Sequence, residues 1–122
     1  NGIVTISVGA KINLPPDNVG DNTINLAYNE FYTFTRANFT TETTPAYSDP
    51  EADAENNLKI LSLPINGTIK IDGVVASVNN VVSFANIDLG KLTYAPNVSI
   101  ITTQTLTFDF SIADVGSGHY SV

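Results

Sequence analysis

The chain has 122 residues, a formal net charge of −7 and no cysteine. This length suits one domain. With five basic residues against twelve acidic ones, the protein repels phosphate groups, so nucleic acid and anionic membrane surfaces are not expected partners. Hydrophobic residues make up 43% of the chain but form no run long enough for membrane insertion.

The first predicted strand, IVTISV, covers residues 3–8, where apolar side chains alternate with Thr5 and Ser7. Such alternation indicates a half-buried strand. Its apolar residues are Ile3, Val4, Ile6 and Val8. The stretch NLPPDNVGDN, residues 13–22, has the composition of a linker. We therefore predict an N-terminal strand and linker at 1–28 and a β domain at 29–122.

Two dipeptides further along favour tight turns. Asn66-Gly67 and Asp72-Gly73 bracket the short strand TIKI, and both dipeptides tolerate positive φ, so each predicts a hairpin turn. The stretch SFANIDLGKL, residues 83–92, is compatible with one helical turn.

The last predicted strand, TLTFDFSIAD, is the clearest in the chain. Leu106, Phe108, Phe110 and Ile112 share one face, and Asp109 points outward from the other. No segment has a sustained helical period, and turn signals recur at the spacing typical of all-β sandwiches. The sequence therefore predicts an all-β fold.

The residues offer little for catalysis. His119 is the only histidine and has no serine or acid motif around it, although a hydrolytic nucleophile needs a positioned base. A glycosidase needs two placed carboxylates, but the acids here lie mostly in predicted loops, and no tryptophan is present to form a sugar platform. We expect no enzymatic activity.

The densest group of charges lies in YSDPEADAENNLKI, residues 47–60. Asp49, Glu51 and Asp53 place three carboxylates within one turn, which suits the flexible oxygen ligands that calcium prefers. Two alternatives stay open from the residues alone: a solvated acidic loop, and a catalytic site of the magnesium type.

Asn38, Asn66 and Asn97 begin glycosylation sequons, and the Asn66 sequon coincides with a predicted turn.

Three segments in order carry a family resemblance: NEFYTFTRANF from residue 29, YSDPEADAENNLKILSLPINGTIKIDGVVASVNNVVSFANIDLGKLTYAPN from residue 47, and LTFDFSIADVGSG from residue 106. Together they resemble the cadherin-like tandem repeat of bacterial surface adhesins, related to VCBS and chondroitin-sulfate-proteoglycan-type repeats and also found in phage virion proteins. The matching positions are Phe39, Asp49, Pro50, Glu51, Asp53, Leu63, Pro64, Gly67, Gly73, Asp88, Gly90, Lys91, Leu92, Tyr94, Pro96, Phe108, Phe110 and Asp114.

The resemblance implies an immunoglobulin-like, cadherin-like antiparallel β-sandwich with a structural or adhesive role outside the cell, at a cell surface or in a virion. It also implies a calcium ion near one end of the domain, held by Asp49, Glu51, Asp53 and Asp114. Ala52 stands where the family usually has glycine.

The resemblance also implies one further strand after the Asp-x-Gly segment, but a strand of that type occurs here at residues 3–8 instead. We therefore predict that Ile3 to Val8 completes the sandwich of a neighbouring copy, because an added strand satisfies an open sheet edge. Repeated head to tail, this contact builds a fibre. The alternative is that the strand folds back along its own sheet.

Two other functions remain open from the sequence. A carbohydrate-binding module of a secreted protein would use exposed Tyr28, Tyr32 or Tyr47 to bind a glycan, and a surface receptor or glycan is also a conceivable partner of an adhesin. The second of these functions is that of a metal-dependent hydrolase.

Overall fold

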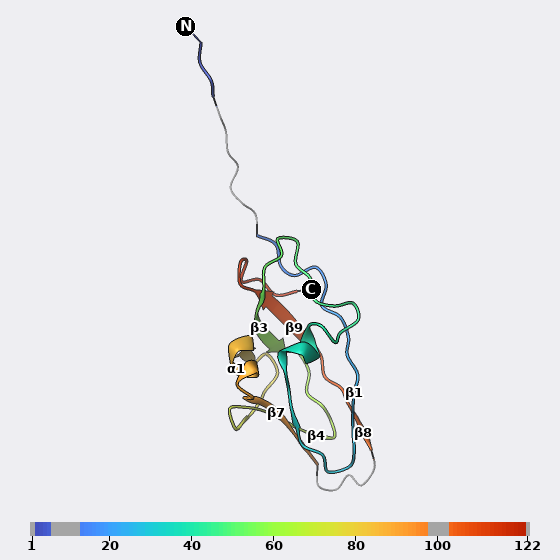
Figure 1. Cartoon of the computed structure of the whole chain (residues 1–122). Helices are drawn as coiled ribbons and strands as arrows, with labels where there is room; N and C mark the ends of the chain where they lie inside the picture. Colours follow the sequence, from blue (N-terminus) through green and yellow to red (C-terminus); the bar gives the residue numbers. More distant parts are fainter. Residues whose placement is uncertain (1, 6–12, 98–102, 122) are drawn as a thin grey trace.

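A computed structural model describes residues 2–5, 13–97 and 103–121, and within them the chain is an antiparallel all-β protein (Figure 1). The strands are β1 (Ile24–Leu26), β2 (Tyr32–Thr33), β3 (Glu55–Ile60), β4 (Gly67–Ile71), β5 (Val74–Val75), β6 (Val81–Ser83), β7 (Leu92–Pro96), β8 (Gln104–Leu106) and β9 (Phe110–Asp114). A 3-10 turn, η1 (Arg36–Phe39), and a short helix, α1 (Phe84–Asp88), complete the elements. The predicted all-β class is confirmed.

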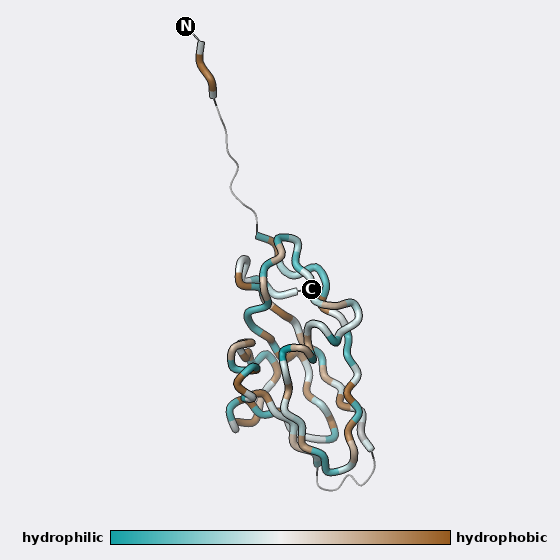
Figure 2. Tube along the Cα trace, in the orientation of Figure 1, coloured by the Kyte–Doolittle hydropathy of each residue, from teal (hydrophilic) through white to brown (hydrophobic). Residues whose placement is uncertain are grey.

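The strands form three antiparallel sheets that share one core. The sheet orders are β2-β7-β4-β5, β6-β3-β9 and β1-β8. In the second sheet Leu58 pairs with Ile112, and in the first Ile69 pairs with Tyr94. All four side chains are buried in the same hydrophobic cluster, and short hydrophobic segments alternate with hydrophilic ones along the tube trace (Figure 2). Burial of these alternate apolar side chains holds the sheets together.

One of the two predicted turns is confirmed and the other is wrong. Asp72 and Gly73 have positive φ values of 50° and 79° and join β4 to β5 as a tight hairpin. Asn66-Gly67 makes no hairpin, because β3 and β4 lie in different sheets. Gly67 instead allows a close approach: a Cβ atom there would lie 2.4 Å from the Tyr94 ring.

The helical turn expected within residues 83–92 is confirmed as α1. Ser83 precedes it, and the Ser83 hydroxyl accepts a hydrogen bond from the Asn86 N–H at 3.1 Å, which satisfies a free donor of the first turn. No helix in the described ranges has the length and hydropathy needed to cross a membrane.

The last predicted strand is divided into β8 and β9. The intervening Asp109 is exposed, as predicted, but its backbone leaves the strand pattern: its C=O accepts from the N–H of Leu61 at 2.8 Å, and its N–H donates to the Ser62 hydroxyl at 2.7 Å. β8 therefore pairs with β1 and β9 with β3. Leu106 and Ile112 are buried, while Phe108 and Phe110 are half-buried against the core.

Much of the predicted linker contacts the rest of the fold. The N–H of Asp17 donates to the C=O of Ser48 at 3.2 Å, and Asp21 forms an antiparallel bridge with Thr44. In the predicted N-terminal strand, the side chains of Ile3 and Val4 are 93% and 87% exposed, whereas Ile6 and Val8 lie outside the described residues. Strand donation therefore stays a prediction.

Candidate metal centre

The acidic loop is shaped by Asp49. Its Oδ1 atom accepts hydrogen bonds from the N–H of Glu51 at 2.9 Å and of Asp53 at 3.2 Å, and its C=O accepts from the N–H of Ala52 at 3.0 Å. This is an Asx-type turn, which aspartate favours because its short side chain reaches the backbone two residues on. The turn uses Oδ1 and leaves Oδ2 available for another role.

Ala52 has a φ of 60°, in the left-handed region. Alanine is strained there by about 1–2 kcal/mol, so we expect Ala52→Gly to raise the free energy of unfolding by up to about 1 kcal/mol. Chemical denaturation measures the change. Ala54→Gly is the control: Ala54 has no positive φ, so its replacement is expected to destabilise the protein. Equal losses in both variants would contradict the strain at Ala52.

Asp114 brings a second element to the loop from the end of β9. Its side chain is fully buried, and its Oδ1 accepts from the N–H of Ser117 at 2.8 Å, from the Ser117 hydroxyl and from the N–H of Gly118 at 3.1 Å. Burial acts to raise the pKa of Asp114 and is the largest single influence, but these hydrogen bonds, together with the interaction with the Asp49 side chain, lower the pKa below its ordinary value.

Glu51 and Gly116 hold residues 13 and 14 close to the acidic loop and to the end of β9. The Oε1 atom of Glu51 accepts a hydrogen bond from the Leu14 N–H at 3.0 Å. The Asn13 side-chain amide donates to the C=O of Gly116 at 3.5 Å. Gly116 in turn lies against Asp53, since a Cβ atom at position 116 would be 2.0 Å from the Asp53 Oδ2. These contacts bring Asn13 beside the acidic loop.

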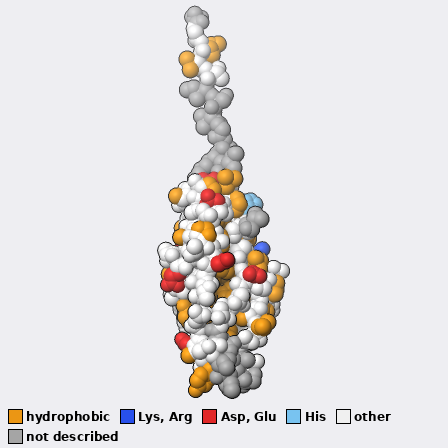
Figure 3. All heavy atoms as spheres, turned by 90° about the vertical axis from the view of Figure 1, so that its right-hand side faces the viewer, with side chains coloured by type: hydrophobic (Ala, Val, Ile, Leu, Met, Phe, Trp, Pro, Cys, Tyr) orange, Lys and Arg blue, Asp and Glu red, His pale blue; other side chains and the backbone are white. Residues whose placement is uncertain are grey.

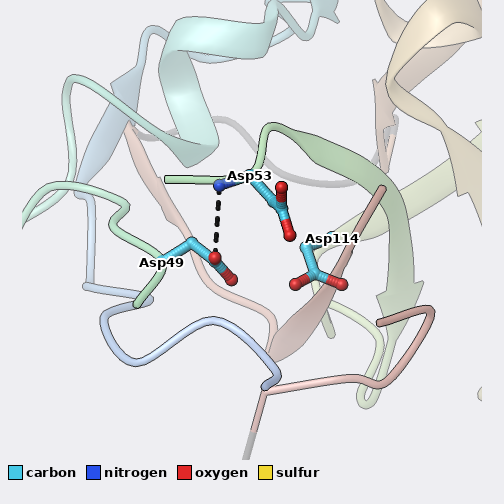
Figure 4. Close-up of side chains that lie close together, drawn as sticks. All are labelled: Asp49, Asp53 and Asp114. Carbon is cyan, nitrogen blue, oxygen red and sulfur yellow. Dashed lines mark hydrogen bonds between the residues drawn. The ribbon is translucent and has the colours of Figure 1, made fainter. Parts of the chain in front are cut away.

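The carboxylates of Asp49, Asp53 and Asp114 converge on one space between the loop and β9 (Figure 4). One oxygen from each lies within 4.8 Å of the others. Five buried side-chain oxygens have no hydrogen-bond partner within the described ranges: Asn13 Oδ1, Asp49 Oδ2, Glu51 Oε2, Asp53 Oδ2 and Asp114 Oδ2. Buried polar atoms are nearly always paired, so this group calls for a partner that residues 2–5, 13–97 and 103–121 do not supply.

Among the residues that the structure describes, no ion pair neutralises these carboxylates. Arg36 instead pairs with Glu55 at 2.6 Å and with Asp88 at 2.7 Å. The surplus negative charge also acts on Tyr47, which lies beside the loop and whose hydroxyl donates a hydrogen bond to the Asp53 C=O at 3.1 Å. Burial first, and then the charge of Asp49 and neighbouring carboxylates, raise the pKa of Tyr47 well above its usual range.

The structure brings together three of the four metal ligands predicted from the sequence, Asp49, Asp53 and Asp114, in one cluster of oxygens. The fourth, Glu51, supplies a buried oxygen without a hydrogen-bond partner and is tied to Leu14. Sequence reasoning missed Asn13, which lies 103 residues from its contact Gly116 and looked like part of a linker.

The tyrosines considered for sugar binding are placed differently from one another. Tyr28 is 62% exposed. Tyr32 and Tyr47 are half-buried, and their hydroxyls are hydrogen-bonded to Asn38 and to the Asp53 C=O. Asn38 itself is buried, and its amide donates to Tyr32 and to Glu42, so its sequon is not accessible to a glycan in the folded protein.

No protein-family model, curated protein or solved structure matches the chain. The cadherin-like resemblance therefore rests on the residues quoted for it.

Proposed function

We propose that the protein is a calcium-binding structural module, a non-enzymatic β-sandwich in which the acidic loop and the end of β9 hold one cation. The observation that carries the proposal is the group of buried, unpartnered oxygens around Asp49, Asp53 and Asp114. The resemblance to adhesin and virion repeats supports a place in an extracellular adhesin, fibre or virion appendage.

The electrostatics support a cation. Carboxylates that are buried close together without a counter-charge destabilise a fold, and Asp114 is fully buried with one oxygen unpartnered. A divalent cation removes that cost by accepting electron pairs from all of the oxygens at once. The aspartates at 49, 53 and 114, with Glu51 and Asn13, would hold it.

The donor set favours calcium over other divalent metals. Its atoms are all carboxylate or amide oxygens, five in number, and calcium takes about 6–8 oxygen ligands from flexible loops. Magnesium demands a tight octahedron and keeps several waters, and zinc prefers nitrogen and sulfur ligands. Backbone carbonyls or water would complete the calcium shell.

Terbium luminescence tests the site directly, because Tb³⁺ occupies calcium sites and is excited by a nearby tyrosine. Tyr47 lies next to Asp53, so we expect saturable terbium emission that added calcium reverses. Tyr47→Phe should remove the emission while calorimetry still detects calcium binding. Tyr28→Phe, a change at an exposed tyrosine, should leave the emission intact.

Gly116→Ala provides a variant that keeps every proposed ligand residue but alters the position of one of them. The new methyl group would lie 2.0 Å from the Asp53 Oδ2 and push it from the cluster, so calcium binding should weaken. If the unaltered protein gives neither terbium emission nor heat of calcium binding, the proposed function is wrong.

A further inference from the structure

A second feature lies away from the acidic cluster. A groove of about 290 Å³ opens beside β1 and β8. Buried Phe34 and Phe39 line it, with Phe108 5.6 Å from Phe34 and Phe110 5.0 Å from Phe39, centroid to centroid. On the face that carries these strands, hydrophobic side chains show between separate acidic ones (Figure 3). The groove is smaller than most small-molecule sites, which measure about 300–1,000 Å³.

The groove meets an open backbone edge at Phe110. On either side of β9, the C=O of Asp109 accepts from the N–H of Leu61, just after β3, and the N–H of Val115 donates to the C=O of Ala54, just before β3. The backbone of Phe110 and Ile112 therefore points the other way. Ile112 is satisfied on that side by Ser121, whose N–H donates to the Ile112 C=O at 2.8 Å. No such bond reaches the N–H or C=O of Phe110 from any described residue.

An apolar floor beside an unpaired strand edge suits an extended segment with alternating apolar side chains. The chain contains one at residues 3–8, with Val4, Ile6 and Val8 on one face. In its described part, Ile3 and Val4 are 93% and 87% exposed, so these side chains contribute nothing to the core of their own copy.

Chain direction makes insertion into the same copy the less stable pairing, because parallel strands pair slightly less stably than antiparallel ones. Asn13 is fixed at Gly116, close to the Asp114 end of β9, so residues 3–8 of that copy would run parallel to β9 from its far end. They would also have to share an edge where Tyr120 already pairs with Ala113 and Ser121 with Ile112. A second copy can approach from the opposite end, antiparallel to β9, and meet only the open part.

We propose that the groove lined by Phe34, Phe39, Phe108 and Phe110 is the acceptor site for residues 3–8 of a second copy of this chain. The donated strand pairs with the backbone of Phe110 and places its valine and isoleucine side chains on the phenylalanines. Donor and acceptor surfaces differ, so each copy gives a strand at one end and receives one in the groove. Such a head-to-tail contact produces open chains of copies when the rotation between neighbours does not close a ring.

Sedimentation velocity of the full chain over a range of concentrations tests this assembly. The measurement is made in EGTA, so that its outcome is independent of the cation site. We expect concentration-dependent oligomers. Val4→Lys/Ile6→Lys should weaken association by more than about tenfold, because it replaces the apolar side chains that pack on the phenylalanines with charged ones, which lose their hydration there. The matched control, Thr5→Lys/Ser7→Lys, adds the same charge on the opposite face and should still associate.

Mixing two deficient variants makes the test specific. Thr107→Trp places a large ring in the groove that Thr107 lines and blocks the acceptor, while its own strand stays intact. Alone, this variant and Val4→Lys/Ile6→Lys should both be monomers; mixed, they should form one-to-one dimers. If Thr107→Trp does not fold, a synthetic peptide of residues 1–12 added to Val4→Lys/Ile6→Lys replaces it, with the amide resonance of Phe110 as the readout.

Three results would overturn the proposal: a monomeric unaltered chain at every concentration, oligomers that persist in Val4→Lys/Ile6→Lys, or a peptide that leaves the Phe110 resonance unchanged. A monomer that Val4→Lys/Ile6→Lys destabilises would show pairing within one copy, which also overturns it.

Discussion

Replacing Phe34 with alanine is expected to lower the free energy of unfolding by about 3–5 kcal/mol. The Phe34 side chain is 1% exposed, and its ring packs edge-on against Tyr32 at 5.2 Å and Phe108 at 5.6 Å. The substitution removes these contacts and leaves a cavity in the core. Since domains of this size are stable by about 5–15 kcal/mol, the loss is a large fraction of the total.

Phe31→Ala is the matched control for this measurement. Phe31 lies three residues away in sequence and is 70% exposed, so its loss should change stability by less than about 0.5 kcal/mol. Urea unfolding of the three proteins gives both values. A loss below about 1 kcal/mol for Phe34→Ala would show that the core does not depend on this ring.

Asp53→Asn is expected to have opposite effects without and with calcium. In EGTA the change removes one of the crowded negative charges and provides an amide donor for the unpartnered Oδ2 of Asp114. The variant should then be as stable as the unaltered protein or more stable, by about 0.5–1.5 kcal/mol. In calcium at about 100 times its dissociation constant, the unaltered protein gains roughly 2.7 kcal/mol, and the variant should lose most of that gain.

Urea unfolding in EGTA and in calcium measures both effects in one series. Asp109→Asn removes the same charge from an exposed position outside the cluster and should respond to calcium as the unaltered protein does. Equal destabilisation of Asp53→Asn in both conditions would mean that Asp53 supports the loop rather than an ion.

Local sequence signals predicted much of the acidic site. Asp49 and Asp53 are four residues apart in one turn, and the Asx hydrogen bonds that set their geometry are made within the same turn. Asp114 could be added from the order of motifs in the resemblance. Asn13 could not, because its approach to Gly116 depends on how residues 103 positions apart are brought together by the fold.

The errors in the fold prediction have the same origin. Asn66-Gly67 has the composition of a hairpin turn, but the choice between a hairpin and a crossing from one sheet to another depends on the partners of β3 and β4. The alternation from Leu106 to Ile112 predicted one strand, and the break between β8 and β9 arises because the backbone of Asp109 bonds to Leu61 and Ser62. Composition and periodicity contain neither partner.

In the proposed calcium site, Glu51 and Asn13 would give the cation a role that resembles covalent cross-linking. The Leu14–Glu51 contact spans 37 residues, and the Asn13–Gly116 contact spans 103. An ion that held Asn13, Glu51 and Asp114 together would close nested loops of similar lengths, and the entropy that such closure removes from the unfolded chain grows with the logarithm of loop length. A chain without cysteine would thereby gain the kind of restraint that disulfides give to other small domains, and chelation would release it as reduction releases a disulfide.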